Sequence, residues 1–133
     1  MPVSTEDYCA ISDFIGRYCW LVDDGDEEGW AALWTEDGVF SGVLPQDAVG
    51  HEALKMVPRG VKATSHPRMR HLPGALNCDY ADASRETVIA RYYNLVTNWP
   101  AGGQFVCMAV CTATLVRHGQ GWRMKRNDIL NLT

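Results

Sequence analysis

The first part of the chain carries its apolar residues at the spacing of an amphipathic helix. Ser4 is a favourable N-cap residue, and a single helical face of apolar side chains follows it. These side chains are Ile11, Phe14, Ile15, Tyr18 and Val22. An acidic run over residues 23–26 ends the pattern. The sequence therefore predicts a long N-terminal helix with one buried face.

Two shorter helices are predicted to follow. Asp26 can cap the first, and its buried stripe is expected to include Trp30 and Trp34. The second is predicted from His51 to Val57, with a loop over residues 58–68 after it. The helical part of the chain is therefore expected to end before residue 69.

From Met69 onward the hydrophobic pattern becomes that of strands. The predicted strands span residues 69–80, 87–99, 104–117 and 122–132, after an earlier one that begins at Val39-Phe40. The strand over 69–80 is expected to be bulged at Pro73-Gly74. Helices followed by an antiparallel meander are typical of an α+β fold.

The strand predicted over residues 104–117 is apolar on both faces. Met108 and Val110 lie on one face, and Cys107 and Ala109 lie on the other. A strand with one solvated face would alternate between apolar and polar residues, and the helices can cover only one side of the sheet. We therefore expect a second copy of the chain to cover the other side, in a homodimer or higher homo-oligomer.

Composition narrows the function classes. With 133 residues, 47% of them hydrophobic, the chain suits a single domain over residues 1–133. Its net charge of -4 gives no basic surface for nucleic acid or for a membrane. Its five cysteines include no CxxC pair. Free, buried thiols are the simplest interpretation, and they indicate a reducing, cytoplasmic setting.

The titratable residues that suit chemistry are His71, Asp23 and Tyr18. His71 lies inside a predicted strand, where it is either a core histidine or a catalytic base. Asp23 directly follows the apolar residues of the first helix, so it is either a solvated helix-end carboxylate or a buried one. Tyr18 lies on the apolar face of that helix, and its hydroxyl needs a partner if it is buried.

Together these residue types suffice for proton abstraction next to a carbonyl group. A carboxylate can orient an imidazole and stabilise its charged form, and a phenol can donate a hydrogen bond to a developing oxyanion. The sequence contains no metal-ligand cluster, phosphate-binding loop or nucleophile motif. We therefore expect no metal and no organic cofactor.

Several segments resemble SnoaL-like members of the nuclear transport factor 2-like superfamily. These segments are YCWLVDDGD at 18–26, LWTEDG at 33–38, Arg70-His71-Leu72 followed by Asn77, and Gly121-Trp122-Arg123. The resemblance covers nearly the whole chain. It implies a cone-shaped fold in which N-terminal helices pack on a curved, mainly antiparallel sheet and enclose a pocket for a small hydrophobic substrate.

Within that superfamily the chain looks most similar to scytalone dehydratase, bile-acid 7α-dehydratase and hexachlorocyclohexane dehydrochlorinase. These enzymes use an aspartate–histidine pair for elimination, and the resemblance places the pair on Asp23 and His71, with a catalytic tyrosine on Tyr18. It implies a cofactor-independent lyase (dehydratase) or isomerase that acts on a hydroxylated cyclic ketone, aromatic, steroid-like or polyketide-like compound. The second active-site histidine of scytalone dehydratase falls near Asn98, a departure from that enzyme's pattern.

The expected substrate-binding residues come from the strand over 87–99 and from the second helix. Val96 and Asn98 are expected to face the pocket, and strand alternation then turns Tyr92 and Asn94 the same way. Trp34 is expected beside the pocket, as core or as wall.

Two other functions stay open at the level of sequence. The segment from Arg123 to Leu130 resembles the end of the small, non-catalytic β subunits of aromatic-ring-hydroxylating dioxygenases, which share this fold. A polyketide-cyclase-like enzyme or a ligand-binding domain would use the same pocket without the histidine.

Overall fold

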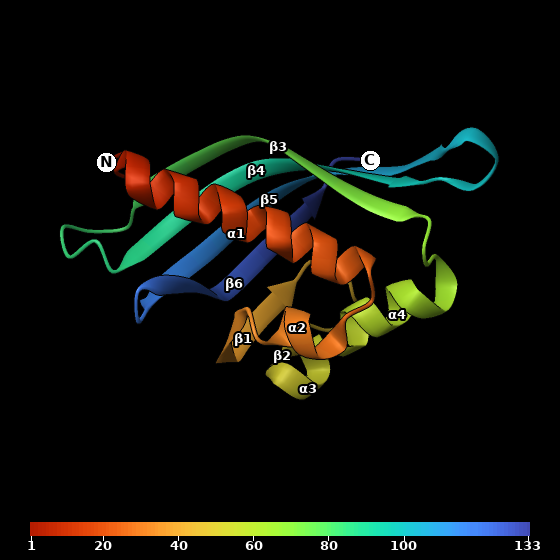
Figure 1. Ribbon diagram of the computed structural model, residues 1–133, viewed down its shortest axis with the longest axis horizontal. Helices are drawn as coiled ribbons and strands as arrows, with labels where there is room; N and C mark the ends of the chain where they lie inside the picture. The colour runs from red at the N-terminus through yellow and green to blue at the C-terminus, as the bar shows by residue number, and fades with distance from the viewer.

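The computed structural model describes all residues from Met1 to Thr133, and it begins with one long helix across the face of a sheet (Figure 1). This helix, α1, spans Thr5–Asp23. The side chain of Ser4 accepts a hydrogen bond from the Asp7 backbone N–H at 3.2 Å, which confirms the predicted N-cap. The residues that α1 buries are Ile11, Phe14, Ile15, Tyr18, Cys19, Val22 and Asp23.

The second helix is shorter than the sequence predicts. α2 spans Glu27–Ala31 and is capped by Asp26, whose carboxylate accepts from the Gly29 backbone N–H at 2.8 Å. Trp34 does not belong to the helix, because it opens strand β1 (Trp34–Ser41). The Leu33 carbonyl accepts a hydrogen bond from the Met124 N–H at 2.8 Å, so pairing with the sheet replaces the next helical turn.

The predicted loop over residues 58–68 is wrong in its first half. A short strand β2 (Ala48–Val49) leads into α3 (His51–Leu54), and a further helix α4 spans Met56–Thr64. Pro58 is the third residue of α4, where a missing N–H breaks no helical hydrogen bond. The chain therefore has four α-helices before residue 69, where the sequence predicts three.

Four long strands complete the sheet: β3 (Met69–Tyr80), β4 (Thr87–Asn98), β5 (Gln104–His118) and β6 (Gly121–Asn131). A short 3₁₀ turn, η1 (Pro100–Gly102), joins β4 and β5. The strand order is β2-β1-β6-β5-β4-β3. Only the β1–β6 pair is parallel, which confirms a mainly antiparallel sheet.

Strand β3 has a bulge, but it lies just after Pro73-Gly74, where the sequence predicts it, because both of these residues keep regular pairing with β4. Its pairing with β4 shifts between Gly74 and Asn77, and Ala75 between them has a positive φ of 55°. Such a bulge bends a strand and increases its twist.

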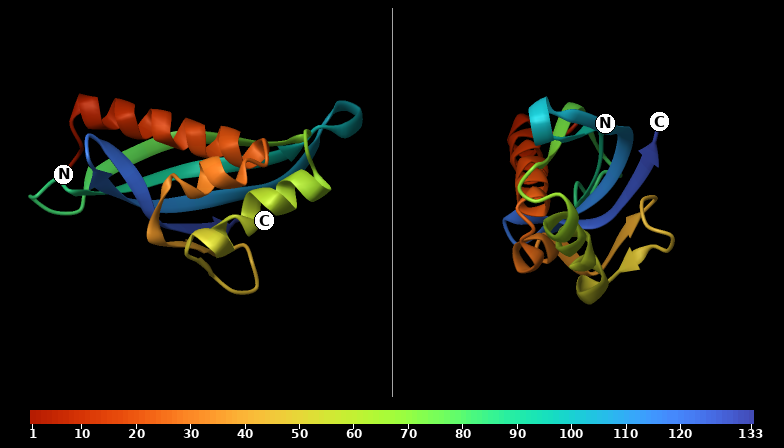
Figure 2. Two further views of the ribbon diagram at one scale, coloured as in Figure 1. Left: turned by 60° about the horizontal axis from the view of Figure 1, so that its bottom comes forward. Right: turned by 90° about the vertical axis from the view of Figure 1, so that its right-hand side faces the viewer.

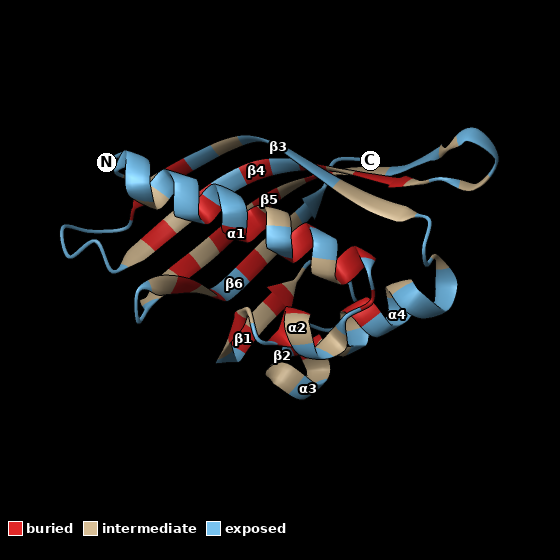
Figure 3. Ribbon diagram, viewed as in Figure 1, coloured by how far each residue is buried: buried red, intermediate tan, exposed pale blue.

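The sheet curves around the helices, and the core lies between these two layers (Figure 2). Buried bands on α1 and on the strands face each other, while the outer side of α1 is exposed (Figure 3). No helix is long and apolar enough to cross a membrane. The predicted α+β architecture of N-terminal helices on a curved sheet is therefore confirmed.

Strand β5 has different surroundings on its two sides. Ala109, Cys111, Ala113 and Leu115 are almost completely buried under the helices. The alternate residues from Met108 to Val116 are only partly buried in the single chain. Phe105, at the start of the strand, is 60% exposed. One chain therefore leaves the outer face of this strand open.

Candidate functional site

A cavity of about 410 Å³ lies between the sheet, α1 and α4. This volume is within the usual range for a small-molecule site. The wall is mainly apolar and is contributed by all layers of the fold: Tyr18, Val22, Trp30, Phe40, Val43, Leu44, Met56, Val57, Gly60, Val61, Thr64, Met69, His71, Asn94, Val96, Val106, Cys107, Ala109 and Ile129. A wider hollow on the outer side of α1 contains neither Asp23 nor His71.

Asp23 is the last residue of α1, and the helix itself turns it inward. It lies one turn beyond Cys19, on the stripe that packs against the sheet, and only 3% of the residue is exposed. The carboxylate therefore sits at the negative end of the helix dipole, and the last turn contains no basic residue to compensate it. Local helix energetics do not explain an aspartate at this position.

His71 supplies both partners of that carboxylate. The ring Nδ1 of His71 lies 2.6 Å from Oδ1 of Asp23, and the His71 backbone N–H donates to Oδ2 at 3.0 Å. Because an ionised carboxylate only accepts hydrogen bonds, Nδ1 carries the hydrogen. The hydrogen-free nitrogen of the neutral ring is then Nε2, and His71 forms part of the cavity wall.

Tyr18 contributes a hydroxyl group to the wall, and Asn127 of β6 holds it. The Asn127 side-chain Nδ2 donates to the hydroxyl oxygens of Tyr18 and Tyr92, each at 3.1 Å. The Tyr18 oxygen is thus an acceptor for Asn127, which leaves its hydrogen available. Burial raises the pKa of Tyr18 well above its ordinary value, so the phenol stays neutral and can act as a donor.

The cavity brings together several residues expected from the sequence. Tyr18, His71 and Val96 are in its wall, and Asp23 lies directly behind His71. Asn94 is in the wall as well, on the same face of β4 as Val96. Strand alternation accounts for this pair.

Three expected substrate-binding residues lie outside the wall. Tyr92 is behind it, in the hydrogen bond with Asn127. Trp34 packs against Trp30, with ring centroids 5.2 Å apart, and it is Trp30 that reaches the wall. Asn98 is half-buried at the end of β4 and is not among the residues that line the cavity.

Sequence reasoning missed Asn127 and most of α4. Asn127 is fully buried, yet it follows the exposed residues Lys125 and Arg126, so alternation gives no signal for it. The sequence predicts a loop from residue 58 onward, which includes all of α4 except Met56 and Val57. The spacing of the α4 wall residues at 57, 60, 61 and 64 is helical, and this is the signal that identifies one face of α4 as wall.

The wall contains no lysine or arginine and no ionised group besides the Asp23–His71 pair. Burial raises the pKa of the Cys19 thiol to about 12 and that of Cys111 to about 11, so both stay neutral. The chain contains no group of three or more histidine, cysteine, aspartate or glutamate side chains that could hold a metal ion. The arrangement is suited to binding an uncharged compound and to moving a proton at His71 Nε2.

The comparisons with known proteins agree with this fold. A model of the SnoaL-like domain matches residues 3–128. Among solved structures, an NTF2-like protein with a cystatin-like fold from Novosphingobium aromaticivorans is 26% identical, with a TM-score of 0.82 over 96% of this chain and 82% of its own. A sequence comparison with curated proteins finds no match.

Two other solved structures share the fold at lower identity. The protein Aln2 from a Streptomyces species is 24% identical, with a TM-score of 0.88 over 98% of this chain and 94% of its own. A candidate scytalone dehydratase from Novosphingobium aromaticivorans is 20% identical, with a TM-score of 0.81 over 95% and 84%. Because the family model spans almost the whole sequence and the fold agrees with it, the chain belongs to the SnoaL-like domain family of the nuclear transport factor 2-like superfamily.

Proposed function

We propose that this protein is a cofactor-independent dehydratase or isomerase that removes a proton from the carbon next to a carbonyl group. SnoaL-like domains include enzymes of both kinds. The observation that carries the proposal is the buried Asp23–His71 pair at the wall of an apolar cavity, with the two side chains 2.6 Å apart. The substrate is a small, uncharged cyclic ketone.

His71 is the base in this proposal. Asp23 fixes the hydrogen on Nδ1, so Nε2 has the lone pair that accepts a proton from the substrate. When the ring becomes charged, the carboxylate already lies beside it and no solvent must reorganise. A catalytic role, and not a gain in stability, then explains why an aspartate occupies the unfavourable end of α1.

Tyr18 is the electrophilic partner. Asn127 donates to the Tyr18 oxygen, so this contact does not use the Tyr18 hydroxyl hydrogen. A carbonyl oxygen of a ligand in the cavity would accept that hydrogen. Negative charge grows on the substrate carbonyl oxygen as the C–H bond breaks, and the Tyr18 hydrogen bond strengthens at that moment. Asn127 acts through Tyr18 as a positioning residue.

The proton balance closes within these groups. The electron pair of the broken C–H bond forms the C=C bond of an enolate, and the proton moves to Nε2 of His71. In a dehydration, the enolate re-forms its C=O bond, and its C=C electron pair forms a new C=C bond to the next carbon as the C–O bond on that carbon breaks. The departing hydroxyl group takes the proton from Nε2 and leaves as water. In an isomerisation, the proton returns to a different carbon.

Solvent exchange tests the proton-abstraction step without requiring that the product be known. The protein in D₂O is incubated with a panel of neutral cyclic ketones, and NMR follows exchange at the carbon beside the carbonyl. We expect faster exchange than in buffer for at least one compound, and loss of that exchange in His71→Ala. Circular dichroism and a thermal melt check that the variant remains folded.

Three results would contradict the proposal. Exchange that is unchanged in folded His71→Ala would exclude His71 as the base. Tight binding of ketones without exchange in the wild type would favour the ligand-binding alternative, and co-purification with a large iron-containing subunit would favour the dioxygenase β-subunit alternative.

We also propose that the chain forms a homodimer through the outer face of the sheet. Exposed large apolar residues on β3 to β6 support this: Leu72, Tyr93, Phe105 and Leu130. A single-chain surface rarely carries so many of them together. Light scattering at micromolar concentration should give twice the chain mass, and a stable monomer would contradict the homodimer.

A cytoplasmic location remains part of the proposal, on the basis of the cysteine content of the sequence.

A further inference from the structure

One polar side chain in the cavity wall has no role in the proposed proton transfer. Asn94 of β4 is only 5% exposed, and its Oδ1 is buried without a hydrogen-bond partner. The neighbouring Cys111 thiol contacts the amide, but a thiol is a weak hydrogen-bonding group. A buried amide left unpaired in this way destabilises the free protein unless something else pairs with it.

The position of Asn94 relative to His71 suggests what that partner is. His71 pairs with Val96 across the β3–β4 ladder, and Asn94 is the next residue on the same face of β4. Diagonal neighbours in such a ladder have Cβ atoms about 7–8 Å apart. This separation is close to the length of two fused six-membered rings, so one such molecule can reach both side chains.

The charge of the wall limits the chemistry of that molecule. No lysine or arginine lines the cavity, and a carboxylate or phosphate would meet the Asp23 carboxylate behind His71. The group that reaches Asn94 is therefore uncharged. A hydroxyl group can pair with either end of an amide, because it both donates and accepts a hydrogen bond.

We propose that Asn94 is a specificity-determining residue that binds a hydroxyl group on the ring farther from the reacting carbonyl of a neutral two-ring ketone. This inference rests on the proposed function for the orientation of the ketone, with its carbonyl at Tyr18 and its acidic carbon at His71. Asn94 thereby makes the cavity bind hydroxylated substrates more tightly than apolar compounds of the same shape.

Calorimetric binding to matched compounds tests the inference. The probes are 1-tetralone and its 5-, 6- and 7-hydroxy isomers, which differ only in the presence and place of one hydroxyl group. We expect at least one isomer to bind about tenfold more tightly than 1-tetralone, the effect of one buried hydrogen bond. Equal affinity for all four compounds would overturn the inference without any variant.

Two variants assign the preference to Asn94. Asn94→Ala should abolish the preference for the hydroxylated isomer while leaving the affinity for 1-tetralone within about twofold. Asn94→Ser, which keeps a shorter polar group in the wall, serves as the second variant should the alanine variant fold poorly. Asn77→Ala is the matched control, because Asn77 is an exposed asparagine on β3. A preference that persists in folded Asn94→Ala would show that another group binds the hydroxyl.

Failure of this inference is distinguishable from failure of the proposed function. His71→Ala should lose exchange in D₂O but keep the preference for the hydroxylated isomer, because Asn94 is unchanged. A wild type that shows the preference but no exchange supports the Asn94 site and contradicts the proposed reaction. The opposite result supports the reaction and contradicts the Asn94 site.

Discussion

Helix α1 holds a half-buried carboxylate, Asp7, near its start and a buried one, Asp23, at its end, and the two have different surroundings. Asp7 lies in the first turn and Asp23 is the last residue, about 24 Å apart along the helix axis at its standard rise. Their side chains are 14% and 4% exposed. The same residue type on the same helix therefore allows a direct comparison of two sites.

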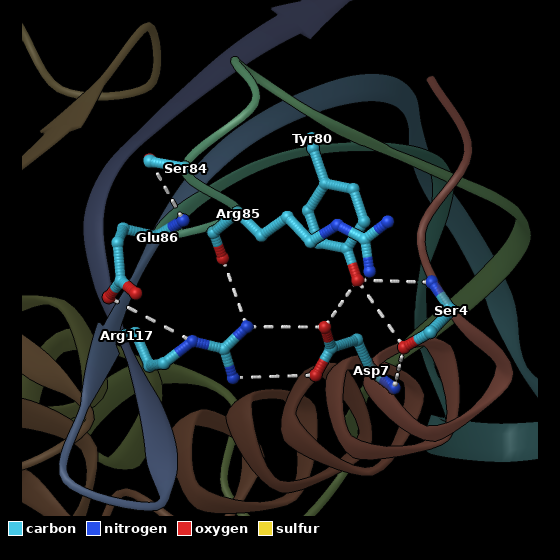
Figure 4. A network of polar contacts seen from close by, with 7 residues as sticks. All are labelled: Ser4, Asp7, Tyr80, Ser84, Arg85, Glu86 and Arg117. Atoms are coloured by element: carbon cyan, nitrogen blue, oxygen red, sulfur yellow. Dashed lines mark hydrogen bonds and ion pairs between the residues drawn. The ribbon is translucent and has the colours of Figure 1, made fainter.

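Hydrogen-bond donors surround the Asp7 carboxylate (Figure 4). The Tyr80 hydroxyl donates to the Asp7 carboxylate, and the Arg117 guanidinium donates to both its oxygens, at 3.2 and 3.5 Å. The Arg117 group is itself engaged with the Arg85 carbonyl at 2.9 Å and stacks 4.3 Å above the ring of Trp122. Each of these groups already has its partner, which is typical of a structural clamp.

Asp23 differs in three respects. It lies at the unfavourable end of the helix dipole, whereas Asp7 lies at the favourable end. Its partner is a histidine, whose ring has a nitrogen that can accept a proton, whereas the guanidinium of Arg117 has only hydrogen-bond donors. Its partner His71 lines the cavity, whereas neither Asp7 nor its partners Tyr80 and Arg117 do. Burial of a carboxylate alone therefore does not mark a functional site; a partner that can exchange a proton and a space beside it do.

The largest effect is expected when the base is removed at the Asp23 end. His71→Asn keeps a side-chain N–H for the Asp23 carboxylate and removes Nε2. Turnover of a substrate found by the exchange screen should fall by about 10²–10⁴-fold, the usual contribution of a positioned base. His71→Ala should reduce turnover equally but also lower the melting temperature, because it leaves Asp23 without its ring partner. Turnover by His71→Asn close to that of the wild type would contradict the assignment.

Asp23→Asn tests the control of the histidine tautomer. The His71 backbone N–H requires an acceptor, so the amide oxygen of the new side chain faces it and the NH₂ group faces Nδ1. Nδ1 must then accept, and the hydrogen moves to Nε2, where it blocks the base. We expect a loss of turnover of at least about 10²-fold. Unfolding in urea should show unchanged or higher stability, since a buried charge leaves the negative end of the helix.

Tyr18→Phe is expected to have a smaller effect on the same site. It removes one hydrogen bond to the substrate oxygen, so kcat should fall by about tenfold. Because the pKa of Tyr18 is raised well above its ordinary value of about 10, its ionisation should cause no fall in wild-type activity up to that pH. A fall below about pH 10 that disappears in Tyr18→Phe would show that the phenol ionises in this range. Asn127→Leu should reproduce part of the Tyr18→Phe loss, since Asn127 only positions the phenol.

Much of the fold follows from sequence pattern because its signals are local. Apolar spacing on α1, the caps Ser4 and Asp26, and strand alternation after Met69 each act within a few residues. The failures occur where distant parts of the chain compete. Trp34 joins the sheet because β6 pairs with its neighbour Leu33, and no window around residue 34 contains that information.

The functional site likewise has features with a local sequence signal and features that depend on distant parts of the chain. Residue type and resemblance point to Asp23, His71 and Tyr18, and the structure pairs Asp23 with His71 and places His71 and Tyr18 in the wall of one cavity. The hydrogen bonds of Asn127 to two tyrosines join β6, α1 and β4, so they depend on the register of the sheet. Asn98 is at the end of β4 and does not line the cavity, although Val96 on the same strand does. Neither feature has a local signature.

The smallest effect on turnover is expected at the Asp7 end, where stability changes instead. Burial by itself raises the pKa of Asp7, but hydrogen bonds from Tyr80 and Arg117 outweigh it and the pKa is lowered overall. A lowered pKa in the folded state stabilises the protein above the unfolded value of about 4, and this contribution is lost as the pH falls through the folded value. Asp7→Asn should therefore reduce the free energy of unfolding by about 1–2 kcal/mol at pH 7 and by much less below about pH 3, with unchanged kcat.

Glu86→Gln is the matched control, because Glu86 meets Arg117 only at 3.9 Å and is 65% exposed. Removing such a surface contact should change stability by less than about 0.5 kcal/mol. A loss of turnover in folded Asp7→Asn, or a stability loss that is the same at pH 3 and pH 7, would contradict the distinction between clamp and catalytic pair.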